Sequence, residues 1–424
     1  MAAQTLAQKL IAKACNRAEV GVDEIVTCNV DLAMFHDSSG PRRLKPMLEK
    51  LGASIWDKSK VVLVMDHYVP EEDDDSRKIL KIARDWASEL QLPNVYDSIG
   101  ICHVVLPQKG HVRPGMFCVG GDSHSPTGGA FGAYMFGVGS TEMLGVVVTG
   151  KIWVKVPKTI VMQWSGKLQT GVLAKDMMLH MTGLYGTNGA EYNVVEYAGS
   201  AIDTLSMQER MTLSNMSAEL GAQAGLIAPD QTTIDYLRQA NVSDPVDLDY
   251  WKTDPASERE IRQFDAGALE PMVAAPHSPS NTHPVTAMSD TRVQVAYIGA
   301  CTGAKLDDLR AAAMLLKNRH VDPSVRLLVA PASQQDQRDA QEEGIMDILI
   351  KAGAQVFPTS CGACSGYGNA LAGASNVISS TARNFKGRMG SAQTNVYLAS
   401  PYTVAASALT GRITDPRIIL AETR

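Results

Sequence analysis

Strand-like and helix-like runs alternate along almost the whole chain of 424 residues. Residues 60–67 (KVVLVMDH) are apolar and β-branched like a buried strand, and residues 73–90 have the apolar spacing of a helix behind an acidic first turn. Strands that alternate with helices are typical of parallel sheets, because parallel neighbours need a crossover connection. We therefore expect an α/β fold with doubly wound sheets, and the length allows two or three domains.

Three α/β domains fit the pattern best. The first, residues 1–157, carries Asp/His pairs and a glycine-rich loop; the second, residues 158–285, ends in a segment rich in proline and serine. Because residues 249–290 combine proline, serine and charge, we interpret them as a linker or a long surface crossing. The third domain, residues 286–424, again alternates strands and helices.

Composition excludes several classes of protein. A net charge of −6 without a sustained basic run argues against nucleic acid as the main partner. No apolar stretch approaches the length of a membrane span, and the first residues lack the apolar core of a signal peptide. Seven irregularly spaced cysteines do not form the pattern of a secreted disulfide framework, so we expect a reducing compartment, the cytoplasm.

Three cysteines follow predicted strands in the third domain. Cys301 stands in IGACTG, and Cys361 and Cys364 form the C-x-x-C of TSCGACSG. Three thiolates are one short of a closed four-cysteine site, and an iron–sulfur cubane held by three would leave one iron open to act as a Lewis acid. The same residues are also compatible with a redox pair, half a zinc site or buried thiols.

Polar residues suited to acid–base chemistry follow strand-like runs of the first domain, where the chain turns. They are Asp66, His67, His103, Asp122, Ser123 and His124. A carboxylate that accepts a hydrogen bond from one imidazole nitrogen fixes the tautomer and raises the basicity of the other. The glycine-rich stretch 120–145 permits close approach of the backbone to a ligand, although it contains no complete nucleotide motif. Each histidine taken alone is equally consistent with a loop cap.

Two further pairs have the spacing of a site. Asn215 and Glu219 are four residues apart and would share one face of a helix, which is also the pattern of a solvated helix face. Arg383 and Arg388 suit a di- or tricarboxylate, because each guanidinium can bind a carboxylate with two charge-assisted hydrogen bonds, although a basic surface loop has the same composition.

Taken in order, these motifs resemble the aconitase superfamily, above all the isopropylmalate dehydratase large-subunit group with its homoaconitase-type relatives. The resemblance covers essentially the whole chain. It is carried by DHYVP, GDSHSPTGGAFGAYMFGVGSTE, NMSAELGAQAGLIAPD, IGACTGAKLDDLR, CGACSG and RNFKGRMG.

The resemblance implies a three-domain α/β large subunit and a [4Fe–4S] cluster on Cys301, Cys361 and Cys364. It implies an acid–base network of Asp66, His67, His103, Asp122, His124 and Glu219, with substrate contacts from Ser123, Asn215, Arg383 and Arg388. The implied enzyme is a hydro-lyase that isomerises a hydroxy dicarboxylic acid, 3-isopropylmalate to 2-isopropylmalate via isopropylmaleate. The family's base is a serine in a G-S-S-R-type segment of a swivelling domain. That segment is absent from this sequence, so a small partner subunit is expected to supply it.

The family's usual C-T-N-G, C-G-P-C and N-R-N-F read C-T-G-A, C-G-A-C and A-R-N-F here, and two of the changes remove an asparagine. Gly303 replaces the asparagine of C-T-N-G, and Ala382 replaces the first asparagine of N-R-N-F. A lost polar contact beside the cluster could change its potential or the substrate. A paralogous dehydratase for 2-methylmalate, 2,3-dimethylmalate, maleate or homocitrate-type acids is therefore an alternative, and a non-enzymatic iron or redox sensor is another.

Overall fold

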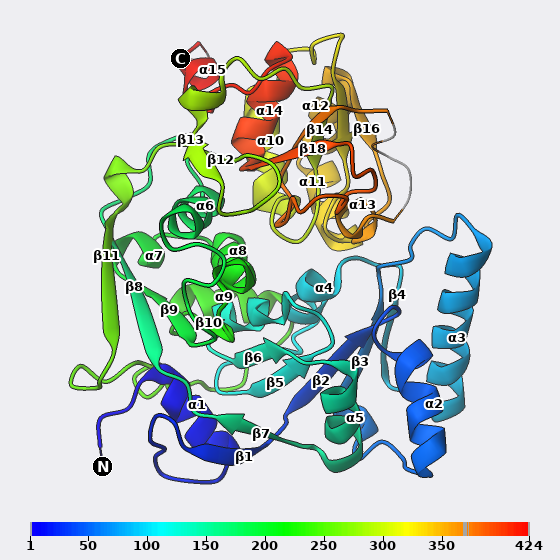
Figure 1. Cartoon of the computed structure of the whole chain (residues 1–424), viewed down its shortest axis with the longest axis vertical. Coiled ribbons are helices and arrows are strands. Elements are labelled where there is room, and N and C mark those ends of the chain that lie inside the picture. Colours follow the sequence, from blue (N-terminus) through cyan, green and yellow to red (C-terminus); the bar gives the residue numbers. More distant parts are fainter. Residues whose placement is uncertain (1, 368–370, 372, 423–424) are drawn as a thin grey trace.

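Parallel strands dominate the structure, as the alternating pattern predicts (Figure 1). A computed structural model describes residues 2–367, 371 and 373–422. In these residues the strands form three sheets of four or more strands and one two-stranded ribbon. The predicted α/β fold is therefore confirmed.

The first parallel sheet has the strand order β4-β3-β2-β5-β6. Its strands are β2 (Leu32–His36), β3 (Val61–Met65), β4 (Asn94–Asp97), β5 (Phe117–Gly120) and β6 (Tyr134–Gly137). From β2 the chain winds outward to β3 and β4 on one side and later to β5 and β6 on the other, so the winding reverses between β2 and β5. Open α/β sheets bind ligands at the carboxyl edge of such a reversal.

Helices and a short antiparallel ribbon complete this part of the chain. The helices are α1 (Leu6–Ala14), α2 (Pro41–Leu51), η1 (Lys58–Lys60), α3 (Asp74–Leu90), α4 (Cys102–Gln108), η2 (Ser125–Phe131) and α5 (Ser140–Thr149), and the ribbon pairs β1 (Ile25–Asn29) with β7 (Lys151–Lys155). The start of α3 follows from its sequence, because the carboxylate of Asp73 accepts the backbone N–H of Ser76 at 2.7 Å.

The second sheet, β10-β9-β8-β11, is also parallel. Its strands are β8 (Thr159–Ser165), β9 (Val194–Ala198), β10 (Ala224–Leu226) and β11 (Glu260–Asp265). The helices of this region are α6 (Ala174–Tyr185), α7 (Ser200–Asp203), α8 (Met207–Met216), η3 (Ser217–Leu220), α9 (Gln231–Gln239) and η4 (Ala266–Ala268).

The third sheet has the order β13-β12-β18-β17-β14-β15-β16. Its strands are β12 (Met272–Ala274), β13 (Thr282–Pro284), β14 (Val295–Ile298), β15 (Arg326–Val329), β16 (Ala354–Val356), β17 (Asn376–Ser379) and β18 (Asn395–Ala399). Its helices are η5 (Val285–Met288), α10 (Leu306–Leu316), α11 (Gln334–Glu342), α12 (Ile345–Ala352), α13 (Gly362–Ser365), α14 (Pro401–Thr410) and α15 (Pro416–Ala421). The winding reverses between β14 and β17, which places a second reversal at the edge where Cys301 follows β14.

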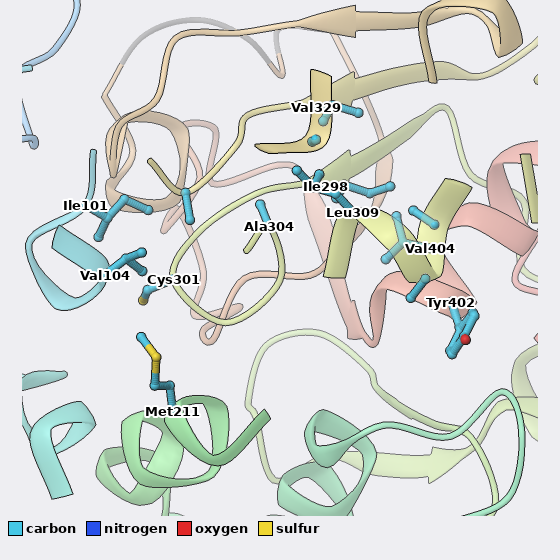
Figure 2. Packing of buried hydrophobic residues seen from close by; sticks show 14 of the residues in the cluster. Ile101, Val104, Met211, Ile298, Cys301, Ala304, Leu309, Val329, Tyr402 and Val404 are labelled. Carbon is cyan, nitrogen blue, oxygen red and sulfur yellow. The ribbon is translucent and has the colours of Figure 1, made fainter. Parts of the chain in front are cut away.

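One hydrophobic core joins elements of all three regions. It contains Ile298 of β14, Val104 of α4 and Met211 of α8, with Cys301 among them. Figure 2 shows the Cys301 side chain directed between Val104 and Met211. Packing of this kind holds the cysteine loop against the first sheet, so the two strand edges face one site.

The interpretation of residues 249–290 as a linker or surface crossing is wrong for the parts of this segment that form strands. Strand β11 pairs with β8, and β12 pairs with both β13 and β18. Residues 272–274 are buried inside the sheet, and β13 beyond them forms its edge. The domain boundaries after residues 157 and 285 stay a prediction.

Candidate active site

Asp122 is the hub of a buried polar network at the carboxyl edge of the first sheet. Its Oδ1 lies 2.7 Å from Nε2 of His103 and accepts the backbone N–H of His124 at 2.8 Å. Its Oδ2 lies 3.7 Å from Nε2 of His67 and of His36. Burial opposes ionisation of Asp122, but the charge and hydrogen bond of His103, with those of the other imidazoles, hold its pKa well below the usual range.

His67 is held by its own neighbour in the sequence. The turn after β3 brings Nδ1 of His67 to 2.7 Å from Oδ1 of Asp66, whose Oδ2 accepts the backbone N–H of Cys102. Burial disfavours the imidazolium, but Asp66 and Asp122 raise the pKa of His67 well above its ordinary value. The carbonyl of Asp66 also accepts the backbone N–H of Cys361 at 2.9 Å, which connects this network to the cysteines.

A third histidine–carboxylate pair joins the first region of the chain to the second. Nε2 of His124 lies 3.0 Å from Oε1 of Glu219, and the same oxygen accepts Nε–H of Arg383 at 2.6 Å. The guanidinium also donates to Oγ of Ser123 at 2.9 Å. Burial opposes the charge, but Glu219 dominates the remaining effects and raises the pKa of His124 to about 9. His124 is therefore protonated at neutral pH and can donate a proton.

These groups border a cavity of 590 Å³. Its lining includes His36, His67, Asp122, Ser123, Arg383 and Arg388. Arg388 Nε, Glu219 Oε2 and Asn215 Oδ1 are buried and have no hydrogen-bond partner in the described part of the chain. Buried polar atoms are normally satisfied, and Arg388, which lines the cavity, is placed to bind a ligand there.

The three sequence-predicted cysteines converge beside this network. Asn215, in the last turn of α8, donates to Sγ of Cys301 at 3.2 Å and to Oγ1 of Thr127 at 2.8 Å. Burial, followed by the charge of Cys364, raises the pKa of Cys301 to about 12. A hydrogen bond from Cys361, with help from Arg388, lowers the pKa of Cys364 to about 5.

The donor set fits a metal cluster. The three thiols are near enough for their charges to disfavour ionisation of Cys301 and Cys361, and a cationic iron core would remove that penalty. Two sulfurs on one zinc ion at about 2.3 Å are at most about 4.6 Å apart. Of the described residues, the sets of three or more ligand atoms within 4.8 Å of one another contain histidines and aspartates but none of the cysteines. The arrangement thus favours a multinuclear group over a single zinc ion.

The site contains residues that the sequence reasoning missed. His36, at the end of the buried strand β2, stacks on His67 with ring centroids 3.7 Å apart. Asp37 beside it accepts the backbone N–H groups of His67 and Tyr68. The signal was a polar His-Asp pair after a buried strand, the same signal that singled out Asp66 and His67. Arg43, a third arginine, also lines the cavity.

The structure explains the departure at Gly303 but gives no role to the one at Ala382. A Cβ at Gly303 would lie 2.2 Å from both Cβ and Oγ of Ser380, whose hydroxyl accepts the backbone N–H of Gly299 at 2.9 Å. The serine thus occupies the space that a larger residue at 303 would need. Ala382 is buried in an apolar cluster with Met389 and is not part of the cavity lining.

Gly303→Ala is expected to lower the free energy of unfolding by about 1–3 kcal/mol, because the added methyl overpacks a site next to a backbone carbonyl. Urea unfolding monitored by circular dichroism measures this. Gly145→Ala is the matched control: its Cβ meets nothing within 4 Å and it lies inside α5, where alanine is favoured by up to about 1 kcal/mol. Equal midpoints for the two variants would contradict the packing argument.

Taken together, the fold and the site define an α/β enzyme with an acid–base cavity and three convergent thiols, built for a small anionic substrate. Comparison with known proteins agrees. The Aconitase family (aconitate hydratase) matches residues 8–411. The chain belongs to the aconitase family, and it is a hydro-lyase.

Relatives match nearly end to end. A probable 3-isopropylmalate dehydratase large subunit from Methanothermobacter thermautotrophicus is 42% identical over 97% of this chain and 98% of its own length. A probable methanogen homoaconitase large subunit from Methanosarcina mazei is 44% identical over 92% of this chain and 99% of its own. The crystal structure of aconitase X from Thermococcus kodakaraensis, 13% identical, shares the fold with a TM-score of 0.52 over 87% of this chain and 88% of that one. The predicted resemblance is confirmed.

Proposed function

We propose that the chain is the large subunit of a [4Fe–4S]-dependent hydro-lyase that interconverts 3-isopropylmalate and 2-isopropylmalate through isopropylmaleate. The observation that carries the proposal is one cavity lined by Arg383, Arg388 and the Asp122 network beside three convergent thiols. Several relatives of about 40% identity over nearly their whole length are named as large subunits of that dehydratase.

Cys301, Cys361 and Cys364 would hold the cluster, which when bound supplies a Lewis-acidic iron with a position free of cysteine. The protein groups then bind, orient and protonate. Arg388, with an unpaired buried Nε, binds a substrate carboxylate, whereas Arg383 is held by Glu219 and Ser123 and presents its remaining N–H groups.

Proton delivery falls to the buried imidazoles. Loss of water breaks a C–O and a C–H bond, so one proton must reach the departing hydroxyl and another must leave the adjacent carbon. His124, protonated at neutral pH and fixed by Glu219, is the proposed donor. Asp66 holds the ring of His67, whose other nitrogen faces Asp122, so His67 is placed to exchange protons with groups in the cavity.

The base that removes the carbon-bound proton is proposed to come from a small subunit that carries the swivelling domain and a catalytic serine. The relatives are named as large subunits, which supports a partner, and no G-S-S-R segment occurs in the sequence. No described helix is both long and apolar enough to cross a membrane. All seven cysteines are free thiols, which supports a cytoplasmic location as part of the proposal.

The test is an anaerobic assay of the cluster-reconstituted chain with and without a candidate small subunit, following the absorbance of the isopropylmaleate double bond. Turnover of 3-isopropylmalate is expected only with both subunits. Full activity of this chain alone would refute the need for a partner subunit. Turnover of 2-methylmalate, 2,3-dimethylmalate or maleate in place of 3-isopropylmalate would show that one of these acids is the substrate. No turnover of any hydroxy acid by a loaded complex would leave a cluster-based sensor as the better account.

A homocitrate-type substrate is the second candidate. Arg43 adds a third guanidinium to the cavity lining, and a tricarboxylate has a third carboxylate to bind. The homoaconitase relative from Methanosarcina mazei matches 92% of this chain. Comparing kcat/KM for homocitrate-type acids and 3-isopropylmalate in wild type and Arg43→Gln decides between them: loss confined to the tricarboxylate favours this second substrate.

The activity is expected to fall as the pH rises through about 9, because His124 must be protonated to donate a proton. The raised pKa of His124 therefore sets the alkaline limb of the pH profile. Glu219→Gln removes the carboxylate that raises the pKa, so the limb should move to lower pH. Glu196→Gln is the control, since Glu196 is also buried but bonds to Thr253 away from the cavity. Profiles of kcat against pH that coincide for wild type and Glu219→Gln would show that another group sets the limb.

A further inference from the structure

Lys175 is a fully buried ammonium without a carboxylate partner. It lies in the first turn of α6, with 1% of its surface exposed. Its Nζ donates to the carbonyls of Ser380 at 2.5 Å and Thr381 at 2.7 Å, and to Oγ1 of Thr302 at 3.2 Å. All three acceptors are neutral, and no ion pair of Lys175 within 4.0 Å occurs in the described part of the chain.

The other two buried lysines each have a counter-ion. Lys305 lies 2.7 Å from Asp308, and Lys9 lies 2.6 Å from Asp254. A buried charge is costly unless it is paired, so the structure leaves Lys175 in need of an anion. Burial lowers the pKa of Lys175 to about 8, and negative charge on Asp308, Cys364 and Cys301 acts against that fall. Asp308 is already paired with Lys305, and the neighbouring Asp176 accepts the backbone N–H groups of Leu173 and Met272. The thiolates of Cys364 and Cys301 are then the other negative groups that act on Lys175.

The contacts of Lys175 also join the two loops that form the site. Thr302 directly follows Cys301 at the end of β14, and residues 380–381 lead from β17 to Arg383. The hydroxyl of Thr302 donates to the carbonyl of Ser380 at 3.0 Å, so the ammonium caps an existing contact between these loops. A single side chain from α6 therefore touches both the loop of a cluster thiol and the loop of a substrate-binding arginine.

We propose that Lys175 is a positioning residue for the cluster: its ammonium offsets part of the thiolate charge and holds the loops of Cys301 and Arg383 together. The inference rests on the proposed cluster. Three thiolates bring three negative charges into a buried site, and net charge and nearby hydrogen bonds are what set the potential of such clusters.

Lys175→Gln is the decisive variant, because the amide keeps N–H donors for the two carbonyls but carries no charge. The potential of the reconstituted cluster is measured by redox titration followed by electron paramagnetic resonance, with iron and sulfide counted on the same sample. The variant is expected to show a lower reduction potential than wild type, since a nearby cation stabilises the more negative, reduced cluster. Lys175→Arg keeps the charge and should have a potential close to that of wild type.

Lys9→Met is the matched control. Lys9 is also buried and donates to two backbone carbonyls, those of Tyr250 and Lys252, but far along the chain from the cysteines. It should lose stability and keep the wild-type potential. A folded Lys175→Gln chain that loses iron while Lys175→Arg retains it would also support the inference.

A wild-type potential in Lys175→Gln would overturn the inference, and so would failure of both Lys175 variants to fold, which would make the residue purely structural. Wild-type protein without iron and sulfide would instead refute the proposed cluster itself. The two failures are therefore distinguishable in one series of samples.

Discussion

Cys301→Ser is expected to remove most of the iron and sulfide from the reconstituted chain and nearly all of its dehydratase activity. Cys301 is the lone cysteine at the second winding reversal, and the nearby buried Cys102 lies in α4, on the side of the first sheet. The lost Lewis acid is worth at least about 4 kcal/mol of transition-state stabilisation, or roughly a thousandfold in rate. Anaerobic metal analysis and kcat with the small subunit measure both effects.

Cys118→Ser is the control for that variant. Cys118 is a free thiol buried in β5 and belongs to the core rather than to the cavity lining. It should change stability and leave the iron content unchanged. Full iron content and activity in Cys301→Ser would show that Cys361 and Cys364 act without it, as a dithiol or in another metal site.

Asp122→Asn is expected to lower kcat by about 10²–10⁴-fold while the chain keeps its iron, because the carboxylate organises the imidazoles that move protons. The Asp122 carboxylate lies 2.7 Å from His103. The charge and hydrogen bond of Asp122 also help to raise the pKa of His67. The neutral amide offers one oxygen and cannot sustain the protonated imidazole. Steady-state kinetics of the two-subunit complex measure the loss.

Asp336→Asn is the matched control for Asp122→Asn. Asp336 is also a hydrogen-bonded carboxylate inside the protein, but its partners are Ser333, Gln108 and Gln208 around α11. Its replacement should alter stability more than kcat. Equal kcat values for Asp122→Asn and wild type would mean that the buried network is structural and that proton transfer occurs elsewhere.

Much of the fold could be predicted because local signals agree with it. The acidic cap and apolar spacing before Leu90 specify α3, and the run 61–65 is buried along its whole length. Residues 249–290 misled because proline and serine also occur at sheet edges, where a missing N–H is tolerated. Only tertiary pairing shows that β12 and β18 are neighbours.

The site could be predicted where polar side chains directly follow a strand. It was harder to predict where side chains from distant segments of the chain meet. Asp66, His67 and Asp122 sit after strands, and the sheet brings them together. The pairing of His124 with Glu219 joins residues 95 positions apart, and Glu219 lies in the short helix η3 rather than sharing α8 with Asn215. Lys175 gave no signal at all, since a lysine at the start of a helix is ordinarily solvated.

The most direct test of the central claim is the number of iron and acid-labile sulfide atoms per chain after anaerobic purification or reconstitution. About four of each, as a cubane cluster requires, is the result we predict. Zinc, or no metal in a folded chain, would contradict the proposal and would mean that the convergent thiols serve another chemistry.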